Sequence, residues 1–350
     1  MLHRRLGTVV RVLSERPGAQ EILVGDDQAI NYPDLTGRVE VGDEVLLNTT
    51  AVDLGLGTGG VHFVIANLSR PIGEVDDSPG HIMKLRYTPH QTAVLSIEED
   101  DSPHQSEIQE FESLDGVPVV CCELHSQIAP AAAAMKVGTD YQARIAYVMT
   151  DGGALPISFS RLVAELKEKG LLDATITCGQ AFGGDIEAIN IYTGLIAAKQ
   201  VAKADAAIVC QGPGNAGTGS RFGFSGIQQG EALNACNVLN GSAIAVPRMS
   251  FADPRERHRG LSHHTLTILT DIVRSLVLVP IPDDKFADQL SKLPHKLRIL
   301  DGEPGLAELK RKGIEVTTMG RSVEEDREFF LAASAGGALA AEMLAARPKV

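Results

Sequence analysis

Short alternating runs of apolar and polar residues, separated by turn signals, fill the first part of the chain. The runs cover residues 8–13, 21–24, 37–48 and 61–66. Successive side chains of a strand point to opposite faces, so this alternation predicts strands with one buried face. Several short strands at this spacing are typical of a small β-barrel or sandwich. The less regular stretch that follows, 71–111, either completes the barrel or bridges to the next part.

The hydrophobic period changes near residue 116. From there, short apolar runs alternate with longer stretches in which apolar residues recur at helical spacing, as Phe159, Leu162, Val163 and Leu166 do. This alternation predicts βα units around a largely parallel sheet. The expected strands are 117–123, 143–149, 174–178, 206–210, 242–246, 276–281, 297–300 and 314–318, and helices are expected from Ser158 and over 186–203 and 323–346.

The two periods together predict an α/β plus all-β protein of two domains. Residues 1–112 form a small β-barrel or sandwich with a bridging segment, and residues 113–350 form a mostly parallel, Rossmann-like three-layer α/β domain. The length of 350 residues is sufficient for two domains, each with its own hydrophobic core, because domains commonly span roughly 100–200 residues. A hydrophobic content of 44% and a charged content of 22% exclude a disordered or fibrous chain.

Charge and cysteine usage narrow the function classes. The 32 Lys and Arg against 45 Asp and Glu give a net charge of −13, and Trp is missing, so we expect no nucleic-acid binding. The cysteines are five, an odd number without a C-x-x-C pair, which favours reduced thiols in the core. No signal peptide opens the chain, and no apolar run reaches the ~18 residues of a membrane span. The sequence predicts a cytoplasmic protein without a membrane partner.

The most informative loop is 211–226, which follows an expected strand and holds six glycines in sixteen residues. Ligands of open parallel sheets bind beyond the carboxyl ends of the strands. Glycines let backbone N–H groups face an anion, and arginine pairs with phosphate or carboxylate. We therefore expect a small anionic metabolite, phosphorylated or nucleotide-like, to bind here. The predicted ligand-binding residues are Gly212, Gly214, Asn215, Gly217, Thr218, Ser220, Arg221 and Arg248.

Two alternatives apply to this loop. Its glycines can simply make tight strand-to-helix turns. Gly212, Gly214 and Gly217 also satisfy the G-x-G-x-x-G pattern of dinucleotide sites, with Arg248 where a 2′-phosphate partner is expected. A helix should begin at the third glycine, however, and further glycines follow instead. The pattern also occurs at 55–60, inside the β-rich part, so dinucleotide binding is the lesser alternative and the cofactor is left unassigned.

A second candidate region, 248–265, is rich in arginine and histidine. If the protein is an enzyme, a question that the sequence leaves open, Asp151, His258 and His264 are the residues we expect to transfer protons. Asp253 could orient one of the histidines. The alternative is that Ser262 caps a helix starting near His263 and that the arginines lie on a solvated loop.

Histidine spacing argues against a metal site in this region. His258 and His263 are five residues apart, and His263 and His264 are neighbours. Neither pair has the i, i+4 spacing that places two imidazoles on one helix face. The sequence therefore predicts no metal site.

Three further patterns have a structural as well as a functional interpretation. His125, Ser126 and Asp151 end successive expected strands and could form a hydrolytic triad, but the chain has no G-x-S-x-G nucleophile elbow. Asp151 and Asp185 could instead cap helices. The glycine-rich segment 48–60 could complete a site in the α/β domain, and a tight barrel corner is the simpler interpretation.

Four segments carry a family resemblance: 48–60, 81–89, 211–219 and 262–265, the last reading Ser-His-His-Thr. Taken together, they resemble a bacterial family defined as a domain of unknown function, over nearly the whole chain. The resemblance implies that the two halves belong to one unit, and it supplies no activity, cofactor or catalytic residue. A binder, and possible enzyme, of a small anionic metabolite is therefore the expected function. The alternative is a non-catalytic sensor or a homo-oligomer joined through the β half and the carboxy-terminal helix.

Overall fold

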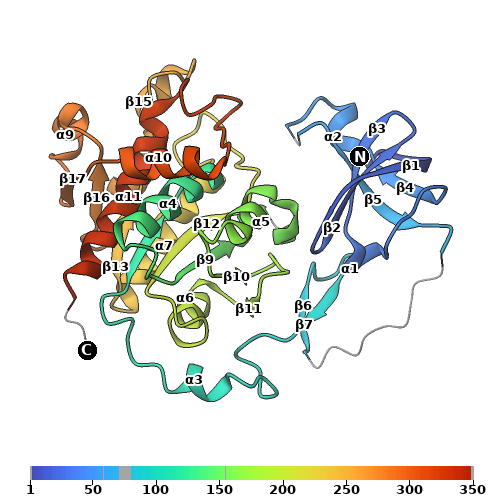
Figure 1. Ribbon diagram of the computed structural model, residues 1–350, viewed down its shortest axis with the longest axis horizontal. Helices are drawn as coiled ribbons and strands as arrows, with labels where there is room; N and C mark the ends of the chain where they lie inside the picture. Colours follow the sequence, from blue (N-terminus) through green and yellow to red (C-terminus); the bar gives the residue numbers. More distant parts are fainter. Residues whose placement is uncertain (1, 58, 71–79, 154, 348–350) are drawn as a thin grey trace. The chain divides into compact units, whose positions relative to one another are not determined.

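The computed structural model describes residues 2–57, 59–70, 80–153 and 155–347. The chain divides into two compact units, unit 1 (Met1–Val94) and unit 2 (Leu95–Val350) (Figure 1). Residues 95–112, which the sequence groups with the β-rich part, belong to unit 2 in this division. Their backbone is bonded there, since Ile97 N donates to Glu187 O at 3.0 Å.

Unit 1 contains a closed barrel of five strands in the order β1-β2-β3-β5-β4. Its interior is apolar and is formed by alternate residues of the strands, such as Val9, Ile22, Val45 and Leu47. Two short helices, α1 (Pro33–Thr36) and α2 (Thr50–Asp53), join its strands, and β6 (Ile82–Lys84) and β7 (Thr92–Val94) form a separate hairpin. The barrel strands are β1 (Arg4–Arg16), β2 (Ala19–Val24), β3 (Asp27–Asn31), β4 (Glu44–Asn48) and β5 (His62–Asn67).

Unit 2 is built on a sheet of eight parallel strands in the order β11-β10-β9-β12-β8-β13-β16-β17. Its central strands are entirely buried, as expected when helices cover both faces of a parallel sheet. The strands are β8 (Pro118–Cys121), β9 (Ile145–Thr150), β10 (Ala174–Cys178), β11 (Ile186–Ala188), β12 (Ala206–Gln211), β13 (Ser242–Ala245), β16 (Leu278–Ile281) and β17 (Lys296–Ile299).

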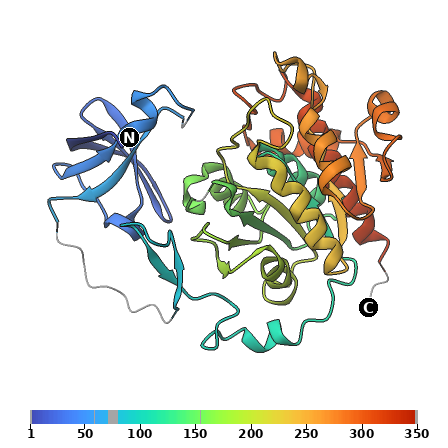
Figure 2. The ribbon, with the colours of Figure 1, turned by 180° about the vertical axis from the view of Figure 1, so that it is seen from behind.

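Helices form a layer on each face of this sheet. One face carries α4 (Ile128–Gly138), α5 (Arg161–Glu168), α10 (Glu303–Lys312) and α11 (Arg327–Ala345). The other carries α6 (Ile191–Gln200) and α7 (Gln228–Val238), seen from behind in Figure 2. The remaining helices are α3 (Gln105–Gln109), α8 (His263–Thr267) and α9 (Ala287–Leu290). This arrangement confirms the predicted barrel followed by a Rossmann-like three-layer α/β domain.

The structure corrects two predicted elements. Residues 314–318 form no strand apart from one isolated bridge, Thr318 to Arg321, because Ile314 and Val316 fill the core beside α10 from an irregular segment. The helix expected over 186–203 begins only at Ile191, where Asn190 Oδ1 accepts from the N–H groups of Tyr192 and Thr193. The residues before it pair with β10 as β11.

Among the described residues, α11 is the one helix long and apolar enough to cross a membrane, and 61% of its apolar window is buried inside the fold. The burial has a visible cause. The small residues of α11 lie against α4, and a Cβ on Gly337 would come within 1.9 Å of Ala131 O. The composition of α11 is therefore that of a core helix.

Candidate functional site

Strands β8 and β12 are neighbours whose following helices leave toward opposite faces of the sheet. The helix α4 follows β8 and packs on one face, and α7 follows β12 and packs on the other. Ligands of open α/β sheets bind at such a switch point, outside the carboxyl ends of the strands. The crevice here is too narrow to hold a water molecule, and Glu123, Gln211 and Gln228 are among its lining residues.

Glu123 lies at the bottom of this crevice and is completely buried. Its Oε1 accepts a hydrogen bond from His264 Nδ1 at 2.6 Å and another from Arg248 at 3.2 Å. Burial raises the pKa of the carboxyl group, but these two partners outweigh it and hold the pKa below its usual value. Gly226, near the start of α7, permits this arrangement, because a Cβ there would lie 2.5 Å from Glu123 Cγ.

Arg248 is also buried and has a second carboxylate partner. It lies 3.4 Å from Asp253, which also binds Arg255 at 2.8 Å and approaches Arg321 to 3.6 Å. The sequence predicts Arg248 as the partner of an anionic ligand, and Asp253 as the group that orients a histidine. In the structure, Arg248 joins Glu123 to Asp253, and Asp253 binds arginines. An anion approaching Arg248 would therefore compete with two carboxylates.

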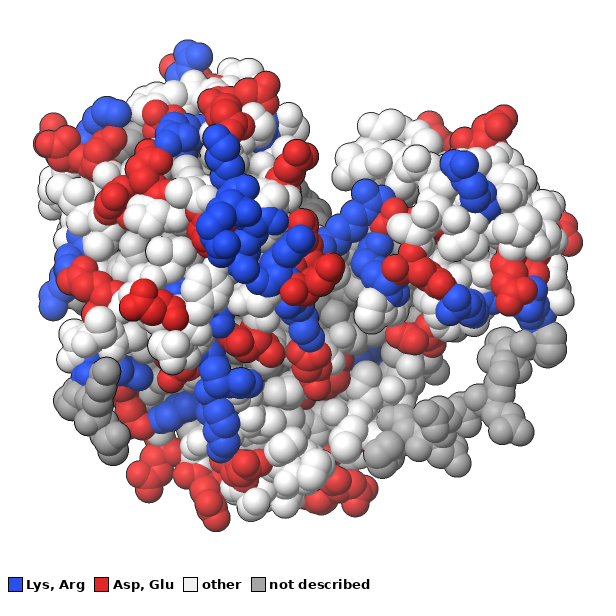
Figure 3. Space-filling model, in the orientation of Figure 1, with Lys and Arg blue, Asp and Glu red and all other residues white. Residues whose placement is uncertain are grey.

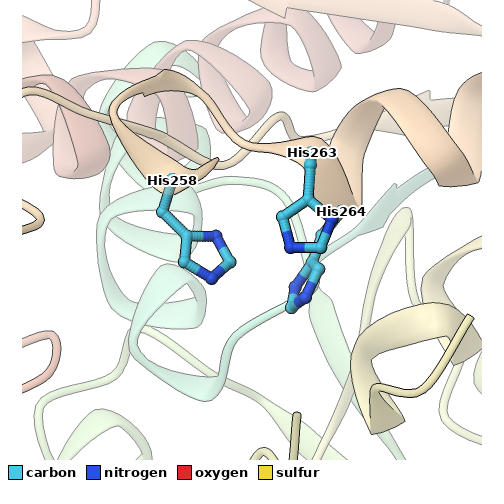
Figure 4. A group of neighbouring side chains, drawn as sticks. All are labelled: His258, His263 and His264. Carbon is cyan, nitrogen blue, oxygen red and sulfur yellow. The ribbon is translucent and has the colours of Figure 1, made fainter. Parts of the chain in front are cut away.

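Three histidines gather beside Glu123 (Figure 4). His258 ends a short 3-10 turn, η5 (Glu256–His258), and His263 and His264 begin α8. The short strands β14 (Met249–Ser250) and β15 (Gly260–Leu261) pair and close the intervening loop. Because this pairing closes the loop, His258 lies beside the start of α8. The centroid of its ring is 5.0 Å from that of His263 and 4.8 Å from that of His264.

Hydrogen bonds fix two of the three rings. His264 donates from Nδ1 to Glu123, and His258 Nδ1 lies 2.8 Å from Ser262 Oγ. Ser262 also caps α8 by accepting from His264 N, as the structural alternative for this region expects. Burial lowers the pKa of His258 to about 3 and also lowers the pKa of His263, with nearby positive charges acting in the same direction. Both of these imidazoles are therefore neutral near pH 7.

The glycine-rich loop folds back on itself as a hairpin over this region. Gly217 bridges to Phe224, and Thr218 N donates to Gly223 O at 2.8 Å. Phe224 stacks on His264 with ring centroids 3.7 Å apart. The base of the loop is held by Asn215, whose Oδ1 accepts from Gln211 Nε2 at 3.1 Å.

The structure separates the predicted ligand-binding residues into two groups. Gly212 and Asn215 lie at the base of the loop, near the switch point, and Gly217 lies beside His264. Thr218, Ser220 and Arg221 are exposed at its tip, where the Thr218 and Ser220 hydroxyls bond to each other. Gly214, with φ of 107°, is exposed between Gly212 and Asn215 of the first group.

Arg221 contacts Asp271 with two hydrogen bonds, of 3.0 and 2.7 Å. Asp271 belongs to a π-helical turn, η6 (Ile268–Ile272), that follows α8. The arginine side chain is 64% exposed, and an ion pair this open contributes less than about 1 kcal/mol to stability. The guanidinium can therefore exchange Asp271 for another anion at small energetic cost.

Asp151 lies at the end of β9, beside a cavity of about 190 Å³. Its carboxylate accepts from Gln180 N at 3.2 Å and from Gln228 Nε2 at 3.4 Å. Asn190 and Gln228, which mark the starts of α6 and α7, also line the cavity. Thr150 and Gln228 line both this cavity and the crevice at Glu123, so the two spaces adjoin.

A larger cavity, of about 650 Å³, is lined by α10 and the chain that follows it. Its charged lining includes Glu303 and Arg327, which are paired with each other at 2.5 Å. We place the candidate site at the strand ends instead, because buried polar groups without partners converge there and the switch point lies there.

A family model described as "Protein of unknown function (DUF3866)" matches residues 28–337 of the chain. The chain belongs to this family. The DUF3866 match runs from the barrel strand β3 into α11, so it includes most of both units and confirms the predicted resemblance to a domain of unknown function. No curated protein and no solved structure matches the chain.

In this DUF3866 protein, His125 contacts Ser160 and not the serine next to it. Its Nε2 lies 2.7 Å from Ser160 Oγ, and its Nδ1 lies 3.3 Å from the carbonyl oxygen of Gln211. Ser160 also accepts from Val163 N as the cap of α5. A neutral imidazole satisfies both contacts, with Nδ1 donating and Nε2 accepting. The contacts of His125 are therefore structural. Among the described residues, His125 and Asp151 share no hydrogen bond.

Acid should destabilise unit 2 through His125. Burial lowers the pKa of His125 to about 4 from 6.5, so the stabilisation by the neutral ring is complete above pH 6.5 and is lost as the pH falls toward 4. We expect a loss of about 2 kcal/mol in the free energy of unfolding between pH 6.5 and 5, measured by chemical denaturation. His125→Gln should lack this part of the loss and His104→Gln should keep it. Equal pH slopes for wild type and His125→Gln would contradict the assignment.

Sequence reasoning misses Glu123 and Gln211 as site residues in this DUF3866 chain. Gln211 ends β12, Glu123 lies two residues beyond the end of β8, and both are almost completely buried. A polar residue at the carboxyl end of an apolar run was the available signal. Its partners could not be found in this way, since Glu123 and His264 are 141 residues apart.

Proposed function

We propose that this protein binds a small anionic metabolite that carries hydroxyl groups, at the carboxyl ends of β9, β10 and β12. The observation that carries the proposal is the cavity of about 190 Å³ between the starts of α6 and α7, joined to the crevice at the switch point. Its size suits a small metabolite better than a polymer. All five cysteines are buried in the core, which supports a cytoplasmic location for this activity.

The cavity and crevice offer acceptors to hydroxyl groups of a ligand. Asp151 presents a carboxylate at the cavity wall. In the adjoining crevice, Gln211 Oε1 and Glu123 Oε2 are buried and have no hydrogen-bond partner among the residues that the structure describes. Buried acceptors without partners reduce stability by about 1–3 kcal/mol each. A ligand hydroxyl that donates to them would recover this free energy, provided that the crevice, too narrow for a water molecule in this structure, widens on binding.

The anionic part of the proposal is supported by the helix starts and the glycine-rich loop. The dipoles of α6 and α7 favour negative charge at the cavity, while the N–H groups of Tyr192 and Thr193 at the start of α6 already donate to Asn190. Arg221 adds an exchangeable cation at the loop tip. In contrast, Lys and Arg are interspersed with Asp and Glu over the described residues of the face in Figure 3, which does not favour a nucleic-acid strand as the anion.

The proposal is tested by thermal shift with AMP, ribose 5-phosphate, inorganic phosphate and, as an uncharged control, ribose. At 100 times its dissociation constant, a probe stabilises by about 2.7 kcal/mol, which corresponds to roughly 5–10 °C for a unit of this size. We expect a shift with at least one phosphorylated probe and its loss in Asp151→Asn, while Asp288→Asn, on the exposed side of α9, keeps it. No shift with any phosphorylated probe would count against the proposal. If the bound probe is recovered unchanged, the protein acts as a sensor. If the probe is recovered as a product, the protein is an enzyme.

Arg221 and Asp271 provide a matched pair of variants. Arg221→Ala should weaken binding of the phosphorylated probe by up to roughly fivefold, because an ion pair of an arginine this exposed contributes less than about 1 kcal/mol. Asp271→Asn should strengthen it, because the variant releases Arg221 from its two hydrogen bonds. Isothermal titration calorimetry measures both. Equal affinities in the two variants would show that the loop tip does not contact the probe. The binding site would then be the cavity at Asp151 alone.

A further inference from the structure

The histidine cluster brings three possible ligand atoms to within 4.8 Å of one another. The rings come from two elements, the 3-10 turn η5 and the start of α8, and surround a common space in Figure 4. The spacing argument from the sequence considered only pairs on a single helix. The β14–β15 hairpin avoids that limit, because it carries His258 back across from the helix that holds His263 and His264.

The hydrogen bonds of His258 and His264 use Nδ1 on both rings and leave Nε2 for a metal. Nδ1 of His264 is used by Glu123, and Nδ1 of His258 is used by Ser262. Nε2 of His263 and Nε2 of His264 are buried and have no hydrogen-bond partner in the described part of the chain. Imidazoles that bind a metal through Nε2 characteristically donate their Nδ1–H to a carboxylate or another oxygen.

We propose that His258, His263 and His264 bind one divalent transition-metal ion, such as Zn²⁺, through their Nε2 atoms. Three imidazoles with a remaining open position are a common zinc donor set, with Zn–N distances of about 2.0–2.1 Å. Tetrahedral geometry then requires the ligand nitrogens to be about 3.3 Å apart. One ring nitrogen of each histidine already lies within 4.8 Å of the others, so rotation of the rings has to bring the three Nε2 atoms to that value.

The charges around the cluster are compatible with a dication. The positive charges of Arg248, Arg255 and Arg257 lie near His258 and His263 and lower the pKa values of these rings. Glu123 and Asp253 lie against Arg248, and Asp253 also binds Arg255, so carboxylates offset these two arginines. Glu123 stands behind His264 and makes its Nε2 a stronger donor to a metal.

The metal site does not depend on the proposed function. If both are present, the ion would lie close to the glycine-rich loop, because Gly217 would place a Cβ 3.6 Å from His264 Cε1. The ion would then supply the positive charge that Arg248, already bound to two carboxylates, does not offer to an anion.

The test uses the full chain, dialysed against EDTA and titrated with Zn²⁺ by calorimetry, and with Co²⁺ by visible absorption. No phosphorylated probe is present. We expect one ion per chain and, with Co²⁺, the absorption of a four- or five-coordinate site. His263→Ala should weaken Zn²⁺ binding by more than about 100-fold, since even residues that only orient ligands change metal affinity by 10–100-fold. His104→Ala, in which the lost ring pairs with Glu107 outside the cluster, should bind as wild type does.

His263 is the decisive position because its ring makes no hydrogen bond to any residue that the structure describes. Its replacement by Ala should therefore leave the fold intact. Circular dichroism and the Tm of the metal-free variant check this, and His258→Ala provides a second variant. Absence of Zn²⁺ binding by wild type, or binding that persists at wild-type affinity in both variants, would overturn the metal site. Thermal shift with AMP on the EDTA-treated protein tests the cavity separately, so failure of one proposal is distinguishable from failure of the other.

Discussion

Replacing Glu123 with Ala should lower the free energy of unfolding of unit 2 by about 3–5 kcal/mol. The carboxylate is fully buried and accepts hydrogen bonds from Arg248 and His264, which are also buried. Its removal leaves part of the charge of Arg248 uncompensated in the interior, a situation that is costly because water cannot reach it. Differential scanning calorimetry should show the transition of unit 2 shifted down by roughly 10 °C or more.

A double variant tests whether charge is the cause. In Glu123→Gln with Arg248→Met, both members of the pair are replaced by neutral side chains of similar size. Asp253 remains paired with Arg255, so the double variant creates no new unpaired carboxylate. We expect it to be more stable than Glu123→Ala, since replacing a whole buried pair is often close to neutral. A single variant that loses under about 1 kcal/mol, or a double variant less stable than the single one, would show that the buried charge is unimportant.

Gly337→Ala should destabilise unit 2 by about 3 kcal/mol. The new Cβ would lie 1.9 Å from Ala131 O and 2.8 Å from Ala131 C, which are backbone atoms of α4. A helix backbone cannot yield as a side chain does, so α4 and α11 have to separate and lose packing along their length. The free energy of unfolding, from chemical denaturation followed by circular dichroism, measures the loss.

Gly336→Ala is the matched control in the same helix. Its Cβ would meet only side-chain atoms, Val246 Cγ2 at 2.8 Å and Val120 Cγ1 at 3.4 Å, which can rotate or shift. Both substitutions gain about 1 kcal/mol of helix propensity, so that term cancels in the comparison. Gly336→Ala should therefore be clearly more stable than Gly337→Ala. Equal stabilities would mean that the contact with α4 does not limit the approach of the helices.

Local pattern was sufficient for most of the fold. The change of period near residue 116 predicted the barrel and the α/β domain, and most strands were placed within a few residues, β10 at its observed bounds Ala174–Cys178. It failed where local and tertiary preferences differ. Ile314 and Val316 look like a strand, but they are buried beside α10 from an irregular segment. The short strand β11 was read as helix because the cap that decides the helix start, Asn190, lies inside the apolar stretch.

The sequence by itself determined the fold class and the edge of the sheet where a site should lie, because hydrophobic period and strand ends are properties of neighbouring residues. Only the tertiary structure decided which side chains meet there. Glu123 joins His264 across 141 residues and Arg248 across 125 residues, and such pairings depend on strand order, which no local period contains. The same long-range closure places Arg248, an expected ligand partner, in a buried ion pair. It also brought His258 to His263 and His264, whose spacing along the chain argued against a metal.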